Sequence, residues 1–230
     1  MSERDASAGD GSLPRAVDRT KNASDAAGNV KTSRYPRTSR RMQRVEGVLR
    51  RRQPSLAVVL EDVHDAHNAS AVLRSCDAVG VLDVHLVYVH DEPPRHALNR
   101  TTSGSAAKWV RTHVHESIEA CYGQLRERGF RIHAAALRED STDLYDLDLS
   151  VPTAFVFGNE QRGVTGAASD LADGTFSIPM QGMVESLNIS VACAVSLYEA
   201  LRQRRKAGLY DAPQLEDGEM AGLRADWIGR

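Results

Sequence analysis

Hydrophobic positions follow two different periods along the middle of the chain. Two wholly apolar runs, 56–60 and 154–157, have the pattern of strands that are buried on both faces of a sheet. Strands and helices that alternate predict an α/β fold, here a mostly parallel sheet covered by helices. The other strand-type runs are 84–89, 132–137 and 176–180, and the stretches with helical spacing are 69–79, 116–128, 166–172 and 189–206.

The two ends of the chain lie outside this alternation. Residues 1–38 are rich in Gly, Ser, Asp and Ala, show little apolar periodicity and are expected to form a disordered arm. Residues 39–54 are expected to hold a basic amphipathic helix that Pro54 ends. The α/β domain is then expected over 55–206, and 207–230 are expected to be a C-terminal tail with a short helix.

Charge is unevenly distributed, although the formal net charge of the 230 residues is only −2. Basic residues concentrate in 37–52 and 202–206. Such clusters on a nearly neutral chain are typical of a surface that binds a nucleic-acid backbone. A solvated helix face is the alternative. The candidates for RNA contact are Arg41, Arg44, Arg202 and Arg204.

Composition narrows the class of protein further. No apolar run approaches the roughly 18–20 residues of a membrane-spanning helix, so no membrane association is expected. The three cysteines are widely spaced and form no CxxC pair, which argues against a zinc ribbon and against a disulfide framework. A reducing, cytoplasmic setting is therefore expected.

Eight histidines raise the question of a metal site. The candidate clusters are His64 with His67, beside two aspartates, and His113 with His115. Pairs of histidines without a third fixed ligand are common by chance, so no metal site is expected.

The glycine-rich signatures of several enzyme classes are absent. No GxGxxG follows the first strand, and neither GxxxxGK[ST] nor GxSxG occurs, so dinucleotide, P-loop and serine-hydrolase sites are not indicated. Two loops after late strands, 158–163 and 178–190, remain as candidates. Ligands of open α/β sheets bind at the carboxyl ends of strands, so these loops could form one pocket.

Three stretches carry polar residues that suggest chemistry. In the first, 68–80, Asn68 stands where a helix N-cap belongs, and Arg74 either pairs with a carboxylate or points at a phosphate or a reacting oxygen. In the second, 155–163, Gly158 would let a ligand approach the main chain, and Glu160 sits at the end of the strand.

The third stretch, IPMQGMVESLNIS at 178–190, places polar residues at the beginning of an apolar helix. Ser186 and Asn188 are both suited to cap that helix. A helix N-terminus is also a polar site for ligands, so capping and a functional role are compatible.

The order and spacing of the three stretches resemble the signature motifs of the SPOUT class of RNA methyltransferases, in particular the TrmH (SpoU) family. The resemblance runs from about Arg40 to the C-terminus and includes SLNISVACAVSLYEA and the tail AGLY…ADWI. It is closest to members that methylate the ribose of guanosine 18 in tRNA. It implies a deep trefoil knot in the C-terminal half, an exception to the rule that chains do not thread loops.

The resemblance also implies S-adenosylmethionine (AdoMet) as the methyl donor, without a metal. Arg74 would have the central catalytic role, with Asn68 keeping Arg74 and the ribose in register. The other residues expected at the catalytic site are Glu160, Ser186 and Asn188. The cofactor is expected to contact the main chain near Ile178, Met180 and Leu187, with Gly158 and Ala135, where the family often has threonine, on the other side.

Two other readings remain open, a ribosomal RNA methyltransferase of the same family and a catalytically silent RNA-binding protein on the same fold. The 38-residue arm is too short and too polar for the separate RNA-binding domain of many ribosomal RNA enzymes, which favours tRNA as the partner. A homodimer is expected, because the helix at 189–206 carries more apolar surface than one sheet face needs and family members dimerise through the knot.

Overall fold

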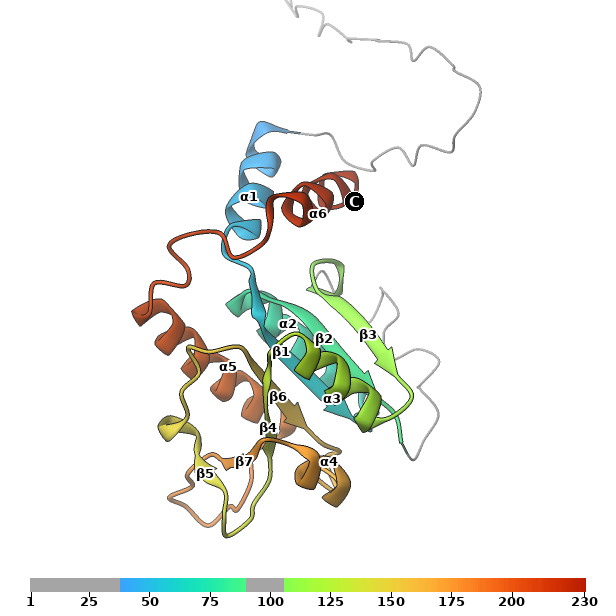
Figure 1. Ribbon diagram of the computed structural model, residues 1–230, viewed down its shortest axis with the longest axis vertical. Coiled ribbons are helices and arrows are strands. Elements are labelled where there is room, and N and C mark those ends of the chain that lie inside the picture. Colours follow the sequence, from blue (N-terminus) through green and yellow to red (C-terminus); the bar gives the residue numbers. More distant parts are fainter. Residues whose placement is uncertain (1–37, 90–105) are drawn as a thin grey trace, which may run out of the picture. The chain divides into compact units, whose positions relative to one another are not determined.

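The computed structural model describes residues 38–89 and 106–230 (Figure 1). Its centre is a seven-stranded sheet in the order β3-β2-β1-β6-β4-β7-β5, and every neighbouring pair of strands is parallel. The expectation of a parallel α/β sheet is therefore confirmed. The strands are β1 (Gln53–Glu61), β2 (Val81–Val87), β3 (Arg111–His115), β4 (Arg131–Ala135), β5 (Thr142–Asp143), β6 (Thr153–Phe157) and β7 (Gly174–Ser177).

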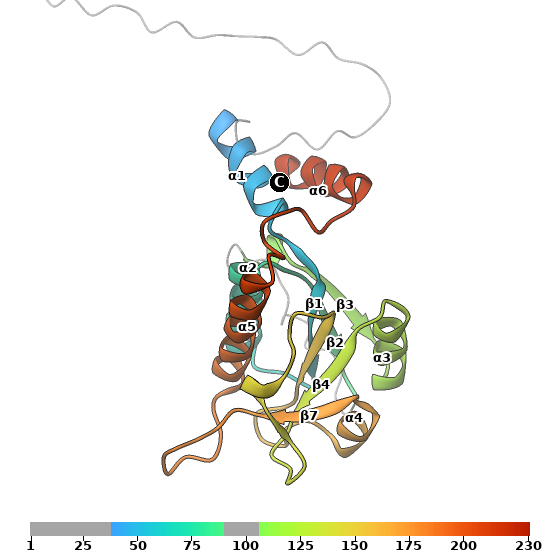
Figure 2. The same cartoon turned by 60° about the vertical axis from the view of Figure 1, so that its left-hand side comes forward.

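Helices cover both faces of the sheet. Figure 2 shows α2 and α5 on one face and α3 and α4 on the other. The helices are α1 (Ser39–Leu49), α2 (Ala66–Val79), α3 (Ile118–Glu127), α4 (Gly166–Leu171), α5 (Ile189–Lys206) and α6 (Asp217–Gly229), with short 3₁₀ turns η1 (Ala106–Lys108) and η2 (Leu144–Asp146).

The central residues of β1, 56–60, are all apolar and buried. Leu56, Val58 and Leu60 pack into the core under α2 and α5. The residues between them, Ala57 and Val59, pack into the core under α3 and α4. Because successive side chains of a strand point to opposite faces, a strand buried on both sides needs apolar residues at every position.

A third cluster joins the two ends of the described chain. Val45 and Leu49 of α1 pack with Met220 and Trp227 of α6. Helix α1 confirms the amphipathic helix expected in 39–54, although it ends at Leu49 and Pro54 already belongs to β1. Helix α6 has 13 residues and is longer than the short helix expected in the tail.

Most predicted elements are present, with shifted ends. Helix α2 ends at Gly80, whose φ of 94° is left-handed and where a Cβ would lie 2.6 Å from the carbonyl oxygen of Arg51. Only glycine fits such a position, as the sequence suggested.

Strand β3 was not predicted. The expected arm lies outside the described residues, apart from Thr38. None of the helices in 38–89 and 106–230 is both long and apolar enough to cross a membrane.

Candidate active site

The candidate site lies where four neighbouring strands end. Strands β1, β6, β4 and β7 are adjacent and parallel, so their carboxyl ends share one edge of the sheet (Figure 1). Asp62 follows β1, Gly158 follows β6, Ala135 ends β4 and Ile178 follows β7. This is the edge at which open α/β sheets bind ligands.

A chain of hydrogen bonds joins the three predicted stretches at this edge. The amide nitrogen of Asn68 donates to the Oε1 atom of Glu160 over 2.8 Å. The amide nitrogen of Asn188 donates to the Oδ1 atom of Asn68 over 3.2 Å. Asn68 is only 6% exposed, so both ends of its amide are engaged within the protein. The fold thus brings together residues that are 92 and 120 positions apart in sequence.

Asn188 and Asn68 were both expected to cap a helix, and the structure separates the two. Asn188 does cap α5, because its Oδ1 atom accepts from the backbone nitrogen of Ser190 over 2.9 Å, while its amide nitrogen reaches Asn68. Asn68 does not cap α2. The N-cap is Asp65, which accepts from the backbone nitrogen of His67 over 2.7 Å, so capping by Asn68 is wrong. Ser186 is exposed and makes no hydrogen bond within the described part of the chain.

The loop after β6 is held by a residue that the sequence did not single out. Asn159 donates to the carbonyl oxygen of Asp62 over 2.9 Å and accepts from the backbone nitrogen of Gln161 over 2.8 Å. At Gly158, a Cβ would lie 2.0 Å from the carbonyl oxygen of Gly163. The protein's own loop therefore requires glycine at this position, and the approach of a ligand to the main chain of Gly158 stays a prediction.

Two acidic residues at the end of β1 were also missed. Glu61 is buried, and its carboxylate accepts from the backbone nitrogen of Thr165 over 2.8 Å and from its hydroxyl over 2.7 Å. It thereby anchors the beginning of α4. Asp62 is buried with a φ of 51°, and its carboxylate accepts from the backbone nitrogen of Val89 over 2.8 Å. The local signal for both is a pair of charges directly after an apolar run.

A pocket of about 480 Å³ opens beside the loop that follows β6. Glu160 lines it, so the hydrogen-bonded chain reaches a cavity. His64 also lines it, but the metal-ligand groups found in 38–89 and 106–230 do not include His64 or His67. The remaining lining residues are Asp65, Asn159, Gln161 and Arg162.

Arg74 is exposed and makes no hydrogen bond or ion pair with the residues that the structure describes. It lies six positions after Asn68 on α2, which corresponds to roughly 9 Å along the helix axis. The structure therefore leaves its guanidinium available to a substrate. It does not show Asn68 holding Arg74, because the amide of Asn68 is bonded to Glu160 and Asn188 instead.

The predicted cofactor residues fall into two groups. Ala135 and Ile178 are partly buried against the core at the ends of β4 and β7. Met180 and Leu187 lie in the irregular segment between β7 and α5. No hydrogen bond joins residues 180–187 to the rest of the described chain, and Met183 is 99% exposed. The main-chain groups of this segment are thus unused by the fold.

The four predicted RNA-binding arginines have different surroundings. Arg44 is exposed on α1, and Arg41 donates to the carbonyl oxygen of Trp227 over 3.3 Å. Arg202 is exposed and forks onto Glu199 over 2.7 and 2.8 Å, and this hydrogen bonding lowers the pKa of the Glu199 carboxyl. These three remain candidates for contact with RNA.

The expectation that Arg204 contacts RNA is wrong. Its side chain is 0% exposed, so it is not available to a tRNA phosphate. Burial lowers its pKa to about 10. The guanidinium donates to Leu149 O (2.9 Å), Ser55 Oγ (2.9 Å), Ser55 O (2.7 Å), Val151 O (2.7 Å) and Gln53 Oε1 (3.3 Å).

Comparison with known proteins places this geometry in context. The profile of the SpoU rRNA Methylase family matches residues 55–198. The tRNA (guanosine(18)-2′-O)-methyltransferase of Thermus thermophilus is 52% identical over 192 residues, which cover 84% of this chain and 97% of that protein. The crystal structure of the Aquifex aeolicus TrmH/SpoU tRNA modifying enzyme superposes with a TM-score of 0.75 and 35% identity, covering 82% of this chain and 95% of that one.

A ribosomal RNA enzyme is also similar, over a smaller share of its length. The AdoMet-bound rRNA methyltransferase from Sinorhizobium meliloti superposes with a TM-score of 0.57 and 27% identity. The match covers 68% of this chain and only 59% of that one.

Proposed function

Because the chain belongs to the SpoU rRNA Methylase family, we propose that it transfers a methyl group from AdoMet to the ribose 2′-hydroxyl of guanosine 18 in tRNA. The observation that carries the proposal is the hydrogen-bonded chain of Glu160, Asn68 and Asn188, which joins the three predicted stretches at the ligand-binding edge of the sheet. A silent RNA-binding protein would not need these residues together.

The extent of similarity favours tRNA over ribosomal RNA as substrate. The Thermus thermophilus tRNA enzyme is matched over 97% of its length, whereas the ribosomal RNA methyltransferase is matched over 59% of its chain. The match thus covers nearly the whole tRNA enzyme but little more than half of the ribosomal RNA enzyme. This difference supports guanosine 18 of tRNA as the target.

Arg74 is the residue that we assign to the transition state. An arginine stays protonated in proteins, so it cannot act as a free base near neutral pH. It can stabilise negative charge that develops on the 2′-oxygen, and its planar guanidinium can bind a substrate phosphate at the same time. Its exposure and its lack of partners in the described chain leave it free for both contacts.

The residues at the sheet edge fit AdoMet. Ala135, Ile178, Met180 and Leu187 offer apolar surface, and the unbonded main chain of 180–187 offers donors and acceptors for a polar ligand. When bound, AdoMet supplies a methyl group activated by a sulfonium whose charge disappears on transfer. The protein's task is then to align the 2′-oxygen and to exclude water. We assign that positioning to Asn188, which is fixed by Asn68, and to Ser186 beside it.

We further propose that the C-terminal half forms a deep trefoil knot. Strand β4 lies between β6 and β7, both of which follow it in sequence, so the chain crosses this part of the sheet more than once. The long irregular segment between β7 and α5 is the part that would pass through the loop. The similarity to TrmH/SpoU structures supports this arrangement.

We also propose a homodimer in the cytoplasm. Val191 and Tyr198 of α5 are exposed and lie seven positions apart, so they share one face of the helix, and Met183 and Val184 are exposed just before it. A solvent-facing apolar surface of this kind indicates a protein partner. The three cysteines are free thiols, which suits a reducing compartment where tRNA is modified.

The function is tested by methylation of unmodified tRNA transcripts with labelled AdoMet, followed by mapping of the product. Label is expected on guanosine 18, and a transcript with 2′-deoxyguanosine at that position should accept none. Label on a base, or on a different ribose only, would contradict the proposal.

The role of Arg74 is tested by single-turnover methylation at saturating AdoMet and tRNA. Arg74→Ala should fold and bind both substrates, but its rate should fall by about 100-fold or more, as when an electrostatic stabiliser of a transition state is removed. Arg74→Lys is the matched control, because it keeps the charge and loses the planar fork, and it should recover little of the rate. A rate of Arg74→Ala within a few-fold of wild type would remove Arg74 from the mechanism.

A further inference from the structure

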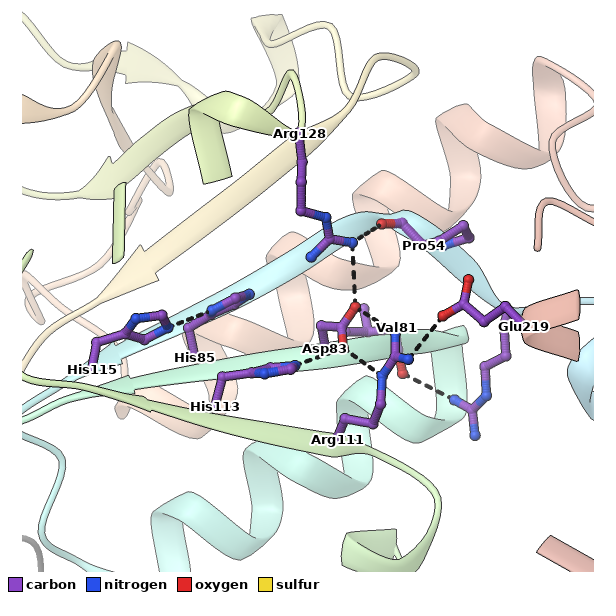
Figure 3. Close-up of polar contacts among 10 residues, drawn as sticks. Pro54, Val81, Asp83, His85, Arg111, His113, His115, Arg128 and Glu219 are labelled. Carbon is purple, nitrogen blue, oxygen red and sulfur yellow. Dashed lines mark hydrogen bonds and ion pairs between the residues drawn. The ribbon is translucent and has the colours of Figure 1, made fainter. Parts of the chain in front are cut away.

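A row of charged and imidazole side chains lies on the face of β2 and β3 that α3 covers (Figure 3). Asp83 and His85 come from β2. Arg111, His113 and His115 come from β3, where parallel pairing sets Arg111 opposite Asp83 and His113 opposite His85. Alternate residues of a strand point to the same face, so the whole row is directed toward α3.

One end of this row is satisfied within the protein. Asp83 is buried and accepts two hydrogen bonds from Arg111, over 2.7 and 2.9 Å, and one from His113 over 2.8 Å. Arg128 lies 3.4 Å from the same carboxylate. Although burial opposes ionisation, these hydrogen bonds hold the pKa of Asp83 below its ordinary value. The Nε2 atom of His113 is thus engaged in a hydrogen bond to Asp83.

The other end of the row has bonding capacity that the described chain does not use. His85 is 0% exposed, and its Nδ1 atom lies 2.8 Å from Nε2 of His115. Figure 3 marks this contact with a dashed line. Its own Nε2 atom is buried without a hydrogen-bond partner among the described residues. A buried polar atom left without a partner costs about 1–3 kcal/mol. The Nδ1 atom of His85 and the Nε2 atom of His115 lie side by side, and it is this pair of nitrogens that one metal ion could bind.

Helix α3 places a third side chain that can bind a metal ion, that of Cys121, beside the two histidines. Cys121 is fully buried, and one donor atom each from His85, His115 and Cys121 lie within 4.8 Å of one another. In 38–89 and 106–230 this is the only group of three histidine, cysteine or acidic side chains that comes so close. The sequence could not show it, since the thiol reaches the histidines only because α3 packs across this corner of the sheet.

We propose that His85, His115 and Cys121 bind one Zn²⁺ ion, with water as the fourth ligand. Two imidazoles and one thiolate form a borderline-soft N₂S set that suits zinc, and three protein ligands leave one position open. Because His115 belongs to the edge strand and is only partly buried, an ion and its water can reach the site from solvent.

The distances require a small adjustment. Tetrahedral zinc with bonds of about 2.0–2.1 Å to nitrogen and about 2.3 Å to sulfur holds its ligand atoms roughly 3.3–3.6 Å apart. The two imidazole nitrogens, at 2.8 Å, must therefore separate slightly, and the thiol must approach. As the ion binds, the ring that holds the proton between the two imidazole nitrogens carries it on its other nitrogen instead, so both imidazoles stay neutral, and the thiol proton leaves to solvent as the zinc–sulfur bond forms. The ion would tie β2, β3 and α3 together.

The test uses the full-length chain after dialysis against a chelator, with Co²⁺ as a spectroscopic probe and Zn²⁺ as competitor. We expect about one Co²⁺ per chain, thiolate-to-cobalt charge-transfer absorption, the visible bands of tetrahedral Co²⁺, and displacement by Zn²⁺. Bound Zn²⁺ should raise the unfolding temperature, since an ion that binds only the folded state stabilises it.

Three variants locate the ion. Cys121→Ser should remove the charge-transfer absorption. His115→Ala should weaken Co²⁺ binding by more than roughly 100-fold, since even outer residues of a metal site can cost that much. His113→Ala is the matched control, because His113 neighbours the site on the same strand but is bonded to Asp83, and it should bind Co²⁺ like wild type.

Three results would overturn the proposal. They are absorption without thiolate character, charge-transfer absorption that persists in Cys121→Ser, and equal losses in His113→Ala and His115→Ala. If Cys121→Ser does not fold, His115→Ala decides the question, because its side chain is at the edge of the sheet. None of these measurements uses methyl transfer, so they test the zinc site independently of the proposed function.

Discussion

Replacing Arg204 by alanine tests whether this arginine belongs to the core or to an RNA-binding surface. Its guanidinium donates to five acceptors, three of which are main-chain carbonyls of Ser55, Leu149 and Val151. These bonds connect the end of α5 to β1 and to the segment before β6. No carboxylate is among the partners, so the positive charge is balanced by carbonyl and hydroxyl dipoles.

The expected loss of stability follows from these contacts. A hydrogen bond to a charged group contributes about 1.5–3 kcal/mol, and an acceptor left buried without a partner costs about 1–3 kcal/mol. The contributions do not add fully, because removing a buried charge also removes its desolvation cost. We therefore expect Arg204→Ala to lower the free energy of unfolding by about 3–5 kcal/mol. This corresponds to a decrease of roughly 10 °C in Tm for a chain of this size.

Urea unfolding measures the effect, with Arg205→Ala as the matched control. Arg205 is the next residue of α5 and is exposed, so its replacement should change stability by less than about 0.5 kcal/mol. Arg204→Met keeps apolar contacts but still leaves the acceptors unpaired, so it should lie between Arg204→Ala and wild type. Midpoints for Arg204→Ala and Arg205→Ala that agree within error would refute the structural role.

The salt dependence of tRNA binding gives a second readout. If Arg204 contacted a phosphate, its removal would lower the slope of log K against log salt by roughly 0.7–0.9. We expect that decrease for Arg44→Ala, which is exposed on α1, with no change in the urea midpoint. Arg204→Ala, studied below its unfolding temperature, should keep the slope of wild type.

Two further predictions concern the loop after β6 and the outer face of α5. Gly158→Ala should destabilise the protein by about 1–3 kcal/mol or more in urea, because its Cβ would meet the main chain of Gly163, whereas Gly166→Ala, which meets nothing within 4 Å, should not. Light scattering should give a mass of about twice 25.2 kDa, and Tyr198→Glu should shift the protein toward monomer; a monomeric wild type at micromolar concentration would contradict the dimer.

The elements that the sequence predicted well are those whose signal is local. Strand β1 is apolar at every central position because both of its faces are buried, and Gly80 ends α2 because its φ of 94° and the nearby main chain exclude a side chain. Strand β3 lacked such a signal. Its inward row is Arg111, His113 and His115, which pair with polar partners on β2, so no apolar alternation marks it.

The candidate site could be named from the sequence, but its bonding could not. Asn68, Glu160 and Asn188 were all selected, and they meet only because β1, β6 and β7 end at one edge of the sheet. The sequence also suggested Asn68 as the cap of α2, although Asp65, three residues earlier, is equally suited to that position. The structure distinguishes the two, since Asp65 reaches the first turn of the helix and Asn68 turns toward Glu160.

The positions of Arg202 and Arg204 on α5 show that helical periodicity is a better guide to RNA contact than a cluster of basic residues in the sequence. Both were assigned to RNA because they stand in one basic run, yet they are two positions apart on a helix and therefore point in directions about 160° apart. The buried face of α5 repeats at Cys193, Leu197 and Ala200, and the next position in that series is Arg204. The sequence thus contained the signal that Arg204 faces inward. It could not show which acceptors would satisfy a guanidinium there, since Ser55 and the carbonyls of Leu149 and Val151 come from elements that are remote in sequence.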